Sequence, residues 1–395
     1  MYFKLKDFNF KNKKVLLRVD FNVPIKNNVI TDDSRIKKAL PTITYILKQN
    51  PKQLIIISHL GRPNSYSNEF SLKPVCQRLN QLLEKEFILY QDYNFRNIKE
   101  LPDLQRIMLE NIRFDKGEEK NDLELAKKLA SFADLFVFDA FGVCHREQAS
   151  VSGIPKFLPS SAGFLMEKEV TFLKEKMENP EKPFVAIIGG AKEDKIEVID
   201  KLIEKVDTLI IGGILANTFL KAKGHNIGNS KYSQEYLEYA KKMLEKYPNK
   251  IALPVDFICA DSFSENAKTR CAGLVDDITG WIIMDIGPYT ITGYKEILSK
   301  AKTVVWAGPI GVFEWEAFKR GTWDIARHLA ELNITKIIGG GDSGDAIVRF
   351  GLEEKMTLVS TGGGASLELL SGKEMPGIKA LEENYETFKN KKNKK

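Results

Sequence analysis

The stretch TLVSTGGGASLELL, residues 357–370, places three consecutive glycines between a short apolar run and a run of good helix formers. Residues 357–359 are typical of a β-strand, and residues 366–370 are typical of a helix. Glycine costs backbone entropy and adds nothing to a core, so its repetition needs another reason. A helix N-terminus presents unpaired N–H groups and about half a positive charge, which glycine leaves open to an anion. The stretch therefore predicts a strand that leads into an anion-binding helix.

The same order of strand, glycines and helix recurs in the second half of the chain, in IIGGAKEDKI (187–196), IIGGILANTF (210–219), WAGPIGVFE (306–314) and IIGGGDSGDAI (337–347). One such turn is a weak signal, because glycine also serves tight turns and close packing, but five together favour a polyphosphate site. No GxxxxGK[ST] motif occurs, which excludes a P-loop enzyme, and no strand–GxGxxG–helix stretch carries the later acidic partner of a dinucleotide site. Asp342, at a helix start, fits either a magnesium ligand or a simple N-cap.

In the first half of the chain, charged residues rather than glycines follow the apolar runs. The strings RVDFNVP (18–24), SHLGRP (58–63), ENIRF (110–114) and DAFGVCHR (139–146) each follow or close such a run, and TDDSRI (31–36) opens a helix. Ligands of open α/β sheets collect at the carboxyl ends of the strands. Planar guanidinium groups suit phosphate and carboxylate oxygens, so this set predicts a basic pocket for a small, multiply anionic ligand. The alternative is that each is a solvated or structural side chain. The set comprises Arg18, Arg35, Arg62, Arg113, Arg146, His59 and His145.

Eleven short apolar runs, from KVLLRVD (14–20) to TLVSTGGG (357–364), alternate with helical stretches such as 123–132 and 195–205. This alternation predicts an α/β protein with buried parallel strands. Eleven strands are many for one open sheet, and 395 residues exceed one domain at roughly 150 residues each. We therefore expect two doubly wound sheets, separated by the polar, helix-forming segment Gly163–Pro183.

The composition, 43% hydrophobic and 28% charged, is that of an ordinary globular protein. The N-terminus has no continuous apolar h-region, and no apolar run approaches the roughly 20 residues that span a bilayer. Four scattered cysteines without a CxxC motif argue against zinc or disulfides and favour a reducing cytoplasm. The lysine-rich tail is expected to be a solvated end rather than a nucleic-acid-binding arm. We expect no nucleic acid or membrane partner.

Six strings in this order resemble the phosphoglycerate kinase family: RVDFNVP, SHLGRP, AGFLMEKE (162–169), LPVDF (253–257), GPIGVFEWEAF (308–318) and STGGGASLELL. The resemblance extends from Lys14 to Leu381. It implies two Rossmann-like, doubly wound parallel-sheet lobes joined by a helix, with a C-terminal segment that returns to the first lobe. The implied boundaries are 1–165 plus about 372–395 for the N-terminal lobe, 166–182 for the connecting helix and 183–371 for the C-terminal lobe.

The resemblance implies reversible phosphoryl transfer from 1,3-bisphosphoglycerate to Mg-ADP, which gives 3-phosphoglycerate and Mg-ATP. Mg²⁺ is the implied cofactor, ADP/ATP the co-substrate, and a monomer the family's usual state. Phosphoryl transfer spreads negative charge over oxygens, so catalysis is mostly positioning and charge stabilisation, without a covalent enzyme intermediate. Water must be kept from the acyl phosphate. We therefore expect the arginine-lined lobe and the glycine-rich lobe to face each other and close about the connecting helix.

The resemblance implies that Asp20 and Asn22 bind the glycerate end of the substrate and that Arg35 is the catalytic arginine. It implies that the non-transferred phosphate is bound by His59, Arg62, Arg113 and Arg146. The full set implied for substrate binding is Asp20, Phe21, Asn22, Arg35, His59, Leu60, Gly61, Arg62, Arg113 and Arg146.

In the glycine-rich lobe, the resemblance assigns the migrating phosphoryl group to Lys192, the nucleotide phosphates to Lys195, the adenine pocket to Gly213, the ribose to Glu314 and magnesium to Asp342. Backbone amides around the last two glycine turns, including Gly341 and Gly364 as catalytic positions, would surround the phosphoryl group. The full set implied for the nucleotide is Ala191, Lys195, Gly213, Glu314, Gly340, Gly341, Asp342 and Ser343.

Several positions depart from the family pattern, mostly in the nucleotide lobe. GGAKEDKI is one residue shorter than the usual GGAKVSDKI, which affects the register of Asp194 and Lys195, and the other departures are Ala307, Ile214, Phe138 and Tyr289. These departures motivate one alternative, a catalytically reduced relative that binds 3-phosphoglycerate or nucleotide as a sensor or scaffold. A kinase for another small carboxylate is a third possibility.

Overall fold

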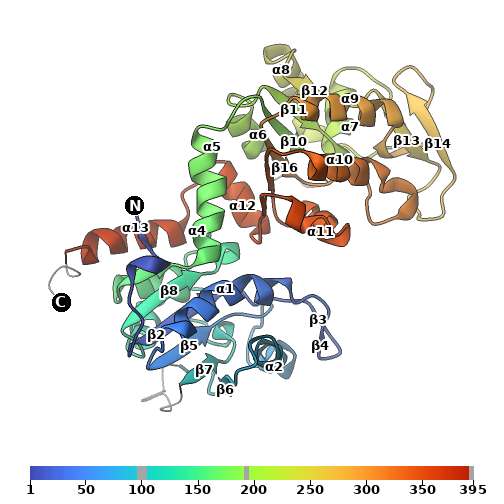
Figure 1. The fold of residues 1–395 in the computed structure, drawn as a ribbon. Helices are drawn as coiled ribbons and strands as arrows, with labels where there is room; N and C mark the ends of the chain where they lie inside the picture. Colours follow the sequence, from blue (N-terminus) through green and yellow to red (C-terminus); the bar gives the residue numbers. More distant parts are fainter. Residues whose placement is uncertain (96–104, 191–194, 391–395) are drawn as a thin grey trace. The chain divides into compact units, whose positions relative to one another are not determined.

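The structure, a computed structural model, describes residues 1–95, 105–190 and 195–390. The chain forms two compact units, one of residues Met1–Thr171 with Glu374–Lys395 and one of residues Phe172–Lys373. Each unit is built on a parallel sheet, so the predicted α/β class with two parallel-sheet lobes is confirmed (Figure 1). The C-terminal segment belongs to the first unit.

The first unit contains a seven-stranded sheet in the order β1-β9-β8-β2-β5-β7-β6, whose paired strands are all parallel. A small hairpin, β3 and β4, lies outside it. The strands are β1 Phe3–Lys4, β2 Lys14–Val19, β3 Ile25–Lys26, β4 Val29–Ile30, β5 Gln53–Ile57, β6 Ile88–Tyr90, β7 Arg106–Leu109, β8 Leu135–Asp139 and β9 Ser160–Ala162. The helices are α1 Ser34–Lys48, α2 Lys73–Leu83, α3 Leu123–Ala130 and α13 Pro376–Phe388.

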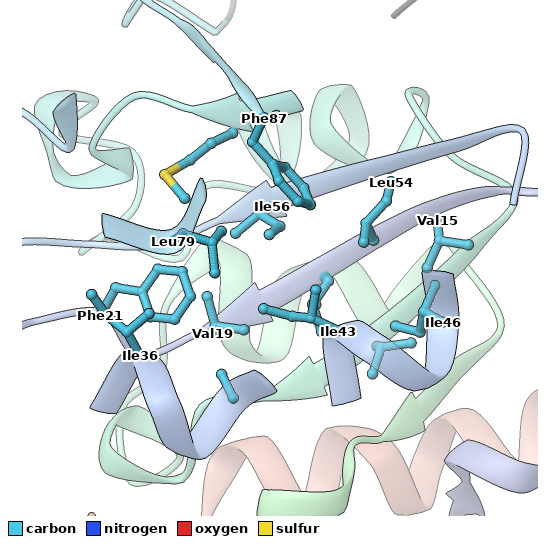
Figure 2. Close-up of a cluster of buried hydrophobic side chains, with 14 of the residues drawn as sticks. Val15, Val19, Phe21, Ile36, Ile43, Ile46, Leu54, Ile56, Leu79 and Phe87 are labelled. Carbon is cyan, nitrogen blue, oxygen red and sulfur yellow. The ribbon is translucent and has the colours of Figure 1, made fainter. Parts of the chain in front are cut away.

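The core of the first unit forms where α1 and α2 cover one face of the sheet. Alternate residues of a strand point to the same face, so Val15 and Val19 of β2 meet Ile36, Ile43 and Ile46 of α1. Figure 2 shows these side chains converging with those of β5 and α2. The same packing fixes the ends of β2 and β5, from which the charged side chains of this unit emerge.

The C-terminal helix α13 packs on the first unit through its buried residue Asn384. The Oδ1 atom of Asn384 accepts the N–H of Ser160 at 2.9 Å, and its Nδ2 donates to the carbonyl of Leu158 at 2.6 Å. At the start of α13, the N–H of Gly377 donates to the carbonyl of Cys144 at 2.8 Å. The end of the chain therefore supports the loop that follows β8.

The segment expected to connect the lobes is helical. It consists of α4 Phe164–Val170, a π-helical stretch Thr171–Glu175 and α5 Lys176–Glu178. The side chain of the buried Asp139, at the end of β8, accepts the N–H of Met166 at 3.0 Å and so caps α4. The boundary between the two units, Thr171 to Phe172, falls at the π-helical stretch.

The second unit contains a six-stranded parallel sheet in the order β12-β11-β10-β16-β17-β18. Its strands are β10 Phe184–Ile188, β11 Thr208–Ile211, β12 Ile251–Ala252, β16 Thr303–Ala307, β17 Thr335–Ile338 and β18 Leu358–Val359. Its helices are α6 Ile196–Leu202, α7 Gly213–Ala222, α8 Leu237–Lys246, α9 Pro288–Ser299, α10 Arg320–Glu331, α11 Asp342–Arg349 and α12 Gly363–Leu370. The order reverses between β10 and β16, which is the switch point where ligands bind in such sheets.

One part of the second unit differs from the sequence prediction. The runs at 252–260 and 281–287 were expected as buried parallel strands, but β13 (Asp256–Ala260) and β15 (Ile282–Ile286) join β14 (Thr269–Gly273) in an antiparallel sheet. Local apolarity does not encode strand direction, and β14 is too polar and exposed to stand out as a strand.

Among the described residues, no helix is both long and apolar enough to cross a membrane. All four cysteines are free thiols.

Candidate active site

Asp20 is the centre of a charged cluster at the carboxyl ends of the strands in the first unit. Its Oδ2 atom accepts a hydrogen bond from Nη1 of Arg35, in the first turn of α1. Its Oδ1 atom accepts the N–H of Asn22 at 3.1 Å and lies 4.0 Å from Nε2 of His59, which follows β5. A Cβ on Gly142, after β8, would clash with Oδ2. Because β2 lies between β5 and β8, this cluster sits at the topological switch point of the sheet.

The charge states in this cluster follow from burial and neighbouring ions. Burial opposes ionisation of Asp20, but its basic neighbours, Arg35 above all, together with the N–H of Asn22 outweigh burial and lower the pKa of its carboxyl. Burial and the nearby guanidinium groups hold the pKa of His59 well below its usual value. Burial lowers the pKa of Arg113 to about 10, which leaves it cationic at neutral pH. The site thus offers fixed cations beside a neutral imidazole.

A chain of hydrogen bonds links the site strings to one another. The side chain of Asn22 accepts the N–H of Gly61 at 2.8 Å, and Nη1 of Arg113 donates to the carbonyl of Gly61 at 2.6 Å. These two bonds join the ends of β2, β5 and β7. Three strings that lie far apart in the sequence are therefore brought together.

Two of the predicted substrate residues, Phe21 and Leu60, have buried side chains. Phe21 is fully buried in the hydrophobic cluster (Figure 2). Its N–H donates to Ser58 at 2.9 Å, and its carbonyl accepts the N–H of Val23. Leu60 is buried, and its backbone bonds on both sides to the side chain of Asn111. Phe21 lies between Asp20 and Asn22, and Leu60 lies next to His59. The packing and hydrogen bonds of Phe21 and Leu60 therefore hold these site residues in place.

The remaining basic residues differ in exposure. Arg62 is exposed on the loop after β5, and Arg146 is half-buried, with Nε donating to Nε2 of His145 at 3.3 Å. Arg18, counted among the basic pocket residues from sequence, is fully buried and contacts His59 instead of the surface.

The second unit contains a cavity of about 540 Å³ at its switch point. Three residues assigned from sequence to different parts of one ligand, Gly213, Glu314 and Asp342, all line it. Much of the remaining lining is apolar or aromatic, as is usual for a small-molecule site, and includes Ile214, Phe257, Phe263, Met284, Val312 and Trp315.

Most glycines of the strand–glycine–helix turns are required by packing. Gly213 has φ +60°, and a Cβ on it would lie 2.6 Å from the backbone nitrogen of Gly190. A Cβ on Gly308 would clash with the carbonyl of Gly189, and one on Gly340 with the nitrogen of Gly363. Close packing, the alternative explanation for a single glycine turn, therefore accounts for the glycines at these positions.

A few glycines remain open. A Cβ on Gly364 would have no neighbour within 4 Å, and one on Gly341 or Gly363 would have none closer than 3.9 Å. Gly341 has φ +74° and precedes α11, while Gly363 and Gly364 begin α12. The bare N-terminal turns of α11 and α12 are therefore the part of the lobe that suits an anion.

The other nucleotide-side predictions fall in three places. Lys195 is buried and donates through Nζ to the carbonyl of Gly189 at the end of β10. Ser343 is buried, and its hydroxyl donates to the carbonyl of Gly339 at 2.8 Å. Ala191, Lys192 and Asp194 lie outside the described residues, and so does the register of the shortened loop.

The departures from the family pattern also have definite positions. Ile214 lines the cavity, Ala307 is buried at the end of β16, Phe138 is buried in β8 and Tyr289 is exposed. Of the four, only Ile214 belongs to the cavity lining.

The pattern of the family described as phosphoglycerate kinase matches residues 5–373 of this chain. The chain belongs to the phosphoglycerate kinase family. A phosphoglycerate kinase of Thermosipho africanus is 50% identical over 390 residues, which cover 95% of this chain and 97% of the relative. One of Finegoldia magna is 48% identical over 393 residues, covering 96% and 98%.

Solved structures show the same similarity. The phosphoglycerate kinase of Coxiella burnetii superimposes with a TM-score of 0.88 at 43% identity, covering 97% of this chain and 99% of that one. The enzyme of Pyrococcus horikoshii gives a TM-score of 0.83 at 35% identity, covering 98% and 100%.

Family membership establishes the activity class. The chain is a phosphotransferase of glycolysis that exchanges a phosphoryl group between 1,3-bisphosphoglycerate and ADP, giving 3-phosphoglycerate and ATP. Its substrates are small molecules, and the alternative of a catalytically reduced relative is not favoured.

Several residues that shape the site were not found from the sequence. Gly142 abuts Asp20, Asn111 holds the loop at Leu60, and Ser150 and Glu118 hold Arg18. Spacing gave no signal for these residues, because they act through contacts between distant parts of the chain.

Proposed function

We propose that the N-terminal lobe, residues 1–165 plus about 372–395, binds 3-phosphoglycerate or 1,3-bisphosphoglycerate. The C-terminal lobe, residues 183–371, binds Mg-nucleotide, and residues 166–182 connect the two. The phosphoryl group passes directly, in line, from one ligand to the other. No side chain becomes phosphorylated, so catalysis consists of positioning and charge stabilisation.

In the N-terminal lobe, Asp20 and Asn22 hold the glycerate end of the substrate, and Arg35 faces its carboxylate and the migrating phosphoryl group. His59, Arg62, Arg113 and Arg146 hold the phosphate that stays behind. The hydrogen bonds that join Asn22, Gly61 and Arg113 support this assignment, because they bring residues of separate strings into one cluster.

The observation that carries the proposal is the cavity lining of the C-terminal lobe. Gly213, Glu314 and Asp342, assigned to adenine, ribose and metal-bound phosphate, come from three separate segments and line one cavity. In the adjoining N-terminal turns of α11 and α12, the amides around Gly341 and Gly364 meet the transferring group. Lys195 contributes near the nucleotide phosphates, Ala191 contacts the nucleotide, and Lys192 meets the migrating phosphoryl group.

A magnesium ion would be held by Asp342. The described residues contain no group of three or more His, Cys, Asp or Glu side chains that could hold an ion by themselves. A single carboxylate, that of Asp342, fits Mg²⁺, because this ion is commonly held by one or two carboxylates together with substrate phosphates. When bound, such an ion neutralises charge on the phosphoryl oxygens.

Direct transfer requires the two bound ligands to meet without water, so we propose closure by bending at the connecting helix. The π-helical stretch Thr171–Glu175, where the two units divide, is the proposed hinge. We also propose that the chain works as a monomer in the cytoplasm, which its four free thiols suit.

A coupled assay with 3-phosphoglycerate and Mg-ATP tests the proposal. We expect turnover with 3-phosphoglycerate and none above background with glycerate or other small carboxylates. Retained binding of 3-phosphoglycerate and nucleotide without turnover would support a sensor or scaffold instead. Omission of Mg²⁺ with excess chelator is expected to abolish turnover.

A further inference from the structure

The imidazole of His59 contacts the guanidinium group of Arg18. Its Nδ1 atom lies 3.2 Å from Nη2 of Arg18, and both side chains are buried. A guanidinium group has five N–H donors and no acceptor, so Nδ1 must be the unprotonated acceptor in this contact. The proton of the neutral ring is therefore on Nε2, the atom that lies 4.0 Å from Oδ1 of Asp20 at the site.

Arg18 is itself fixed by two buried side chains and by the carbonyl of Val19, to which its Nη1 donates at 2.5 Å. Its Nε donates to the hydroxyl of Ser150 at 2.7 Å, and its Nη2 lies 3.9 Å from Oε1 of Glu118. The Ser150 hydroxyl donates to Oε1 of Glu118 at 2.6 Å, and the Ser150 N–H donates to Oε2 at 2.9 Å. All three side chains are fully buried. The hydrogen bonds therefore run in one direction, from Arg18 through Ser150 to Glu118, whose charge balances the guanidinium.

We propose that Ser150 and Glu118 are positioning residues that act through Arg18 to fix His59 as a neutral donor, with its Nε2–H directed at the substrate anion. This inference rests on the proposed binding of phosphoglycerate to the N-terminal lobe. The charged groups that face His59 are Asp20 and Arg18 from β2 and its end, Arg35 from α1 and Arg113 after β7. The ring is buried and three cations face it against one carboxylate, so it stays neutral while it donates a hydrogen bond. Substrate binding through His59 then needs no protonation of the ring near neutral pH.

The tautomer can be measured on the ligand-free full chain labelled with ¹⁵N-histidine, which contains four histidines. A His59→Gln variant assigns the signal. We expect Nδ1 to be unprotonated and Nε2 to be protonated between about pH 6 and pH 8, with no titration of His59 in that range. A protonated Nδ1, or an ordinary titration of His59, would overturn the proposal. This result is independent of turnover, so it stays distinct from a failure of the proposed function.

The positioning role is tested by Ser150→Ala, with Ser152→Ala as the matched control. Ser152 is buried in the same turn, residues 149–153, but its hydroxyl donates to the carbonyl of Gln148 at 3.4 Å. We expect Ser150→Ala to shift the His59 nitrogen signals and raise the KM for 3-phosphoglycerate about tenfold, roughly the loss of one hydrogen bond to a charged group, with the KM for ATP unchanged. The control should change none of these.

Should Ser150→Ala fail to fold, Ser150→Cys replaces it with a group of similar size whose hydrogen bonds are weaker. We expect the same direction of change in the His59 signals and in the KM for 3-phosphoglycerate. Unchanged His59 signals and an unchanged KM in the folded variant would show that Ser150 has no positioning role.

Discussion

Gly142 lies so close to Asp20 that any side chain at position 142 would clash with Oδ2 of the Asp20 carboxylate and come within 3.5 Å of Nη1 of Arg35. The Asp20 carboxylate cannot easily move away, because Arg35 and the N–H of Asn22 hold its two oxygens. The Asp20–Arg35 pair at the predicted substrate site therefore depends on a bare backbone three residues beyond β8.

For Gly142→Ala we expect kcat/KM for 3-phosphoglycerate to fall by about 10², since a displacement near 1 Å at a reacting centre has effects of this size. The KM for ATP should stay the same. Gly293→Ala, at an open position of α9, is the control and should keep full activity. A fully active Gly142→Ala enzyme would show that Asp20 does not bind the substrate.

For Arg35→Ala we expect turnover to fall by roughly 10²–10³, as when one donor aimed at developing charge is lost. Binding of 3-phosphoglycerate should weaken much less, because Arg113 and the other basic residues remain. Steady-state kcat and a separate measurement of 3-phosphoglycerate affinity distinguish the two effects. Nearly full activity would show that Arg35 is not the catalytic arginine.

The cavity lining predicts that nucleotide binding can be followed through Trp315, which lies next to Glu314 in the lining. We expect ADP to change the tryptophan fluorescence, and Trp315→Phe to remove most of that change. Glu314→Gln should weaken ADP binding by about tenfold, the usual loss for one hydrogen bond to a charged group. An unchanged dissociation constant for Glu314→Gln would exclude its contact with the ribose.

Two glycine variants separate packing from ligand contact. Gly340→Ala would clash with the backbone at Gly363, so we expect loss of stability in the second unit. Gly364→Ala occupies open space at the start of α12, where alanine is the better helix former by about 1 kcal/mol. We therefore expect Gly364→Ala to keep or gain stability and to lose turnover. Thermal unfolding and kcat measure the two effects, and full activity of Gly364→Ala would assign that glycine no catalytic contact.

The stability of the second unit should depend on the ionisation of Asp285. This carboxyl is buried at the end of β15, accepts the N–H of Gly321 at 2.6 Å, and burial raises its pKa to about 8. The unfolded chain releases the same proton near pH 4. The folded state therefore binds more protons between these values, and the contribution of Asp285 to the unfolding free energy declines from about pH 4 to about pH 8.

The measurement compares wild type with Asp285→Asn, whose side chain cannot ionise. We expect the stability of wild type relative to the variant to fall by at most about 1.4 kcal/mol per pH unit in that range and to level off above it. The four tryptophans, Trp281, Trp306, Trp315 and Trp323, all lie in the second unit, so their fluorescence reports on that unit. A pH-independent difference would show that Asp285 is already ionised near neutral pH.

Much of the fold could be predicted because its signals are local. Each of the eleven apolar runs contains a strand, and the glycine turns at 212–213, 339–341 and 362–364 precede helices as expected. The turn at 308–311 instead leads into a loop and then a short 3-10 helix, Glu316–Phe318. The antiparallel sheet was missed, because the pattern of a strand does not state which neighbour it pairs with or in which direction. The edge strand β14 gave no apolar signal at all.

The site was predicted less completely, for the same physical reason. Charged residues at strand ends could be identified singly, and Asp20, Arg35 and His59 indeed lie together. Arg18 is buried and contacts His59 from the core. The sequence alone could not distinguish it from the other arginines near strand ends. Its partner Ser150 is 132 residues away, and a contact over that distance exists only in the folded chain.

The packing of α13 has a consequence for biosynthesis. Residues 172–373 form the second unit without interruption, whereas the first unit needs Asn384 to bond with Ser160 and Leu158. As the chain leaves the ribosome, the second unit is therefore available in full before the first has received its last helix. The unit whose translation begins first is therefore the last to have all of its helices available.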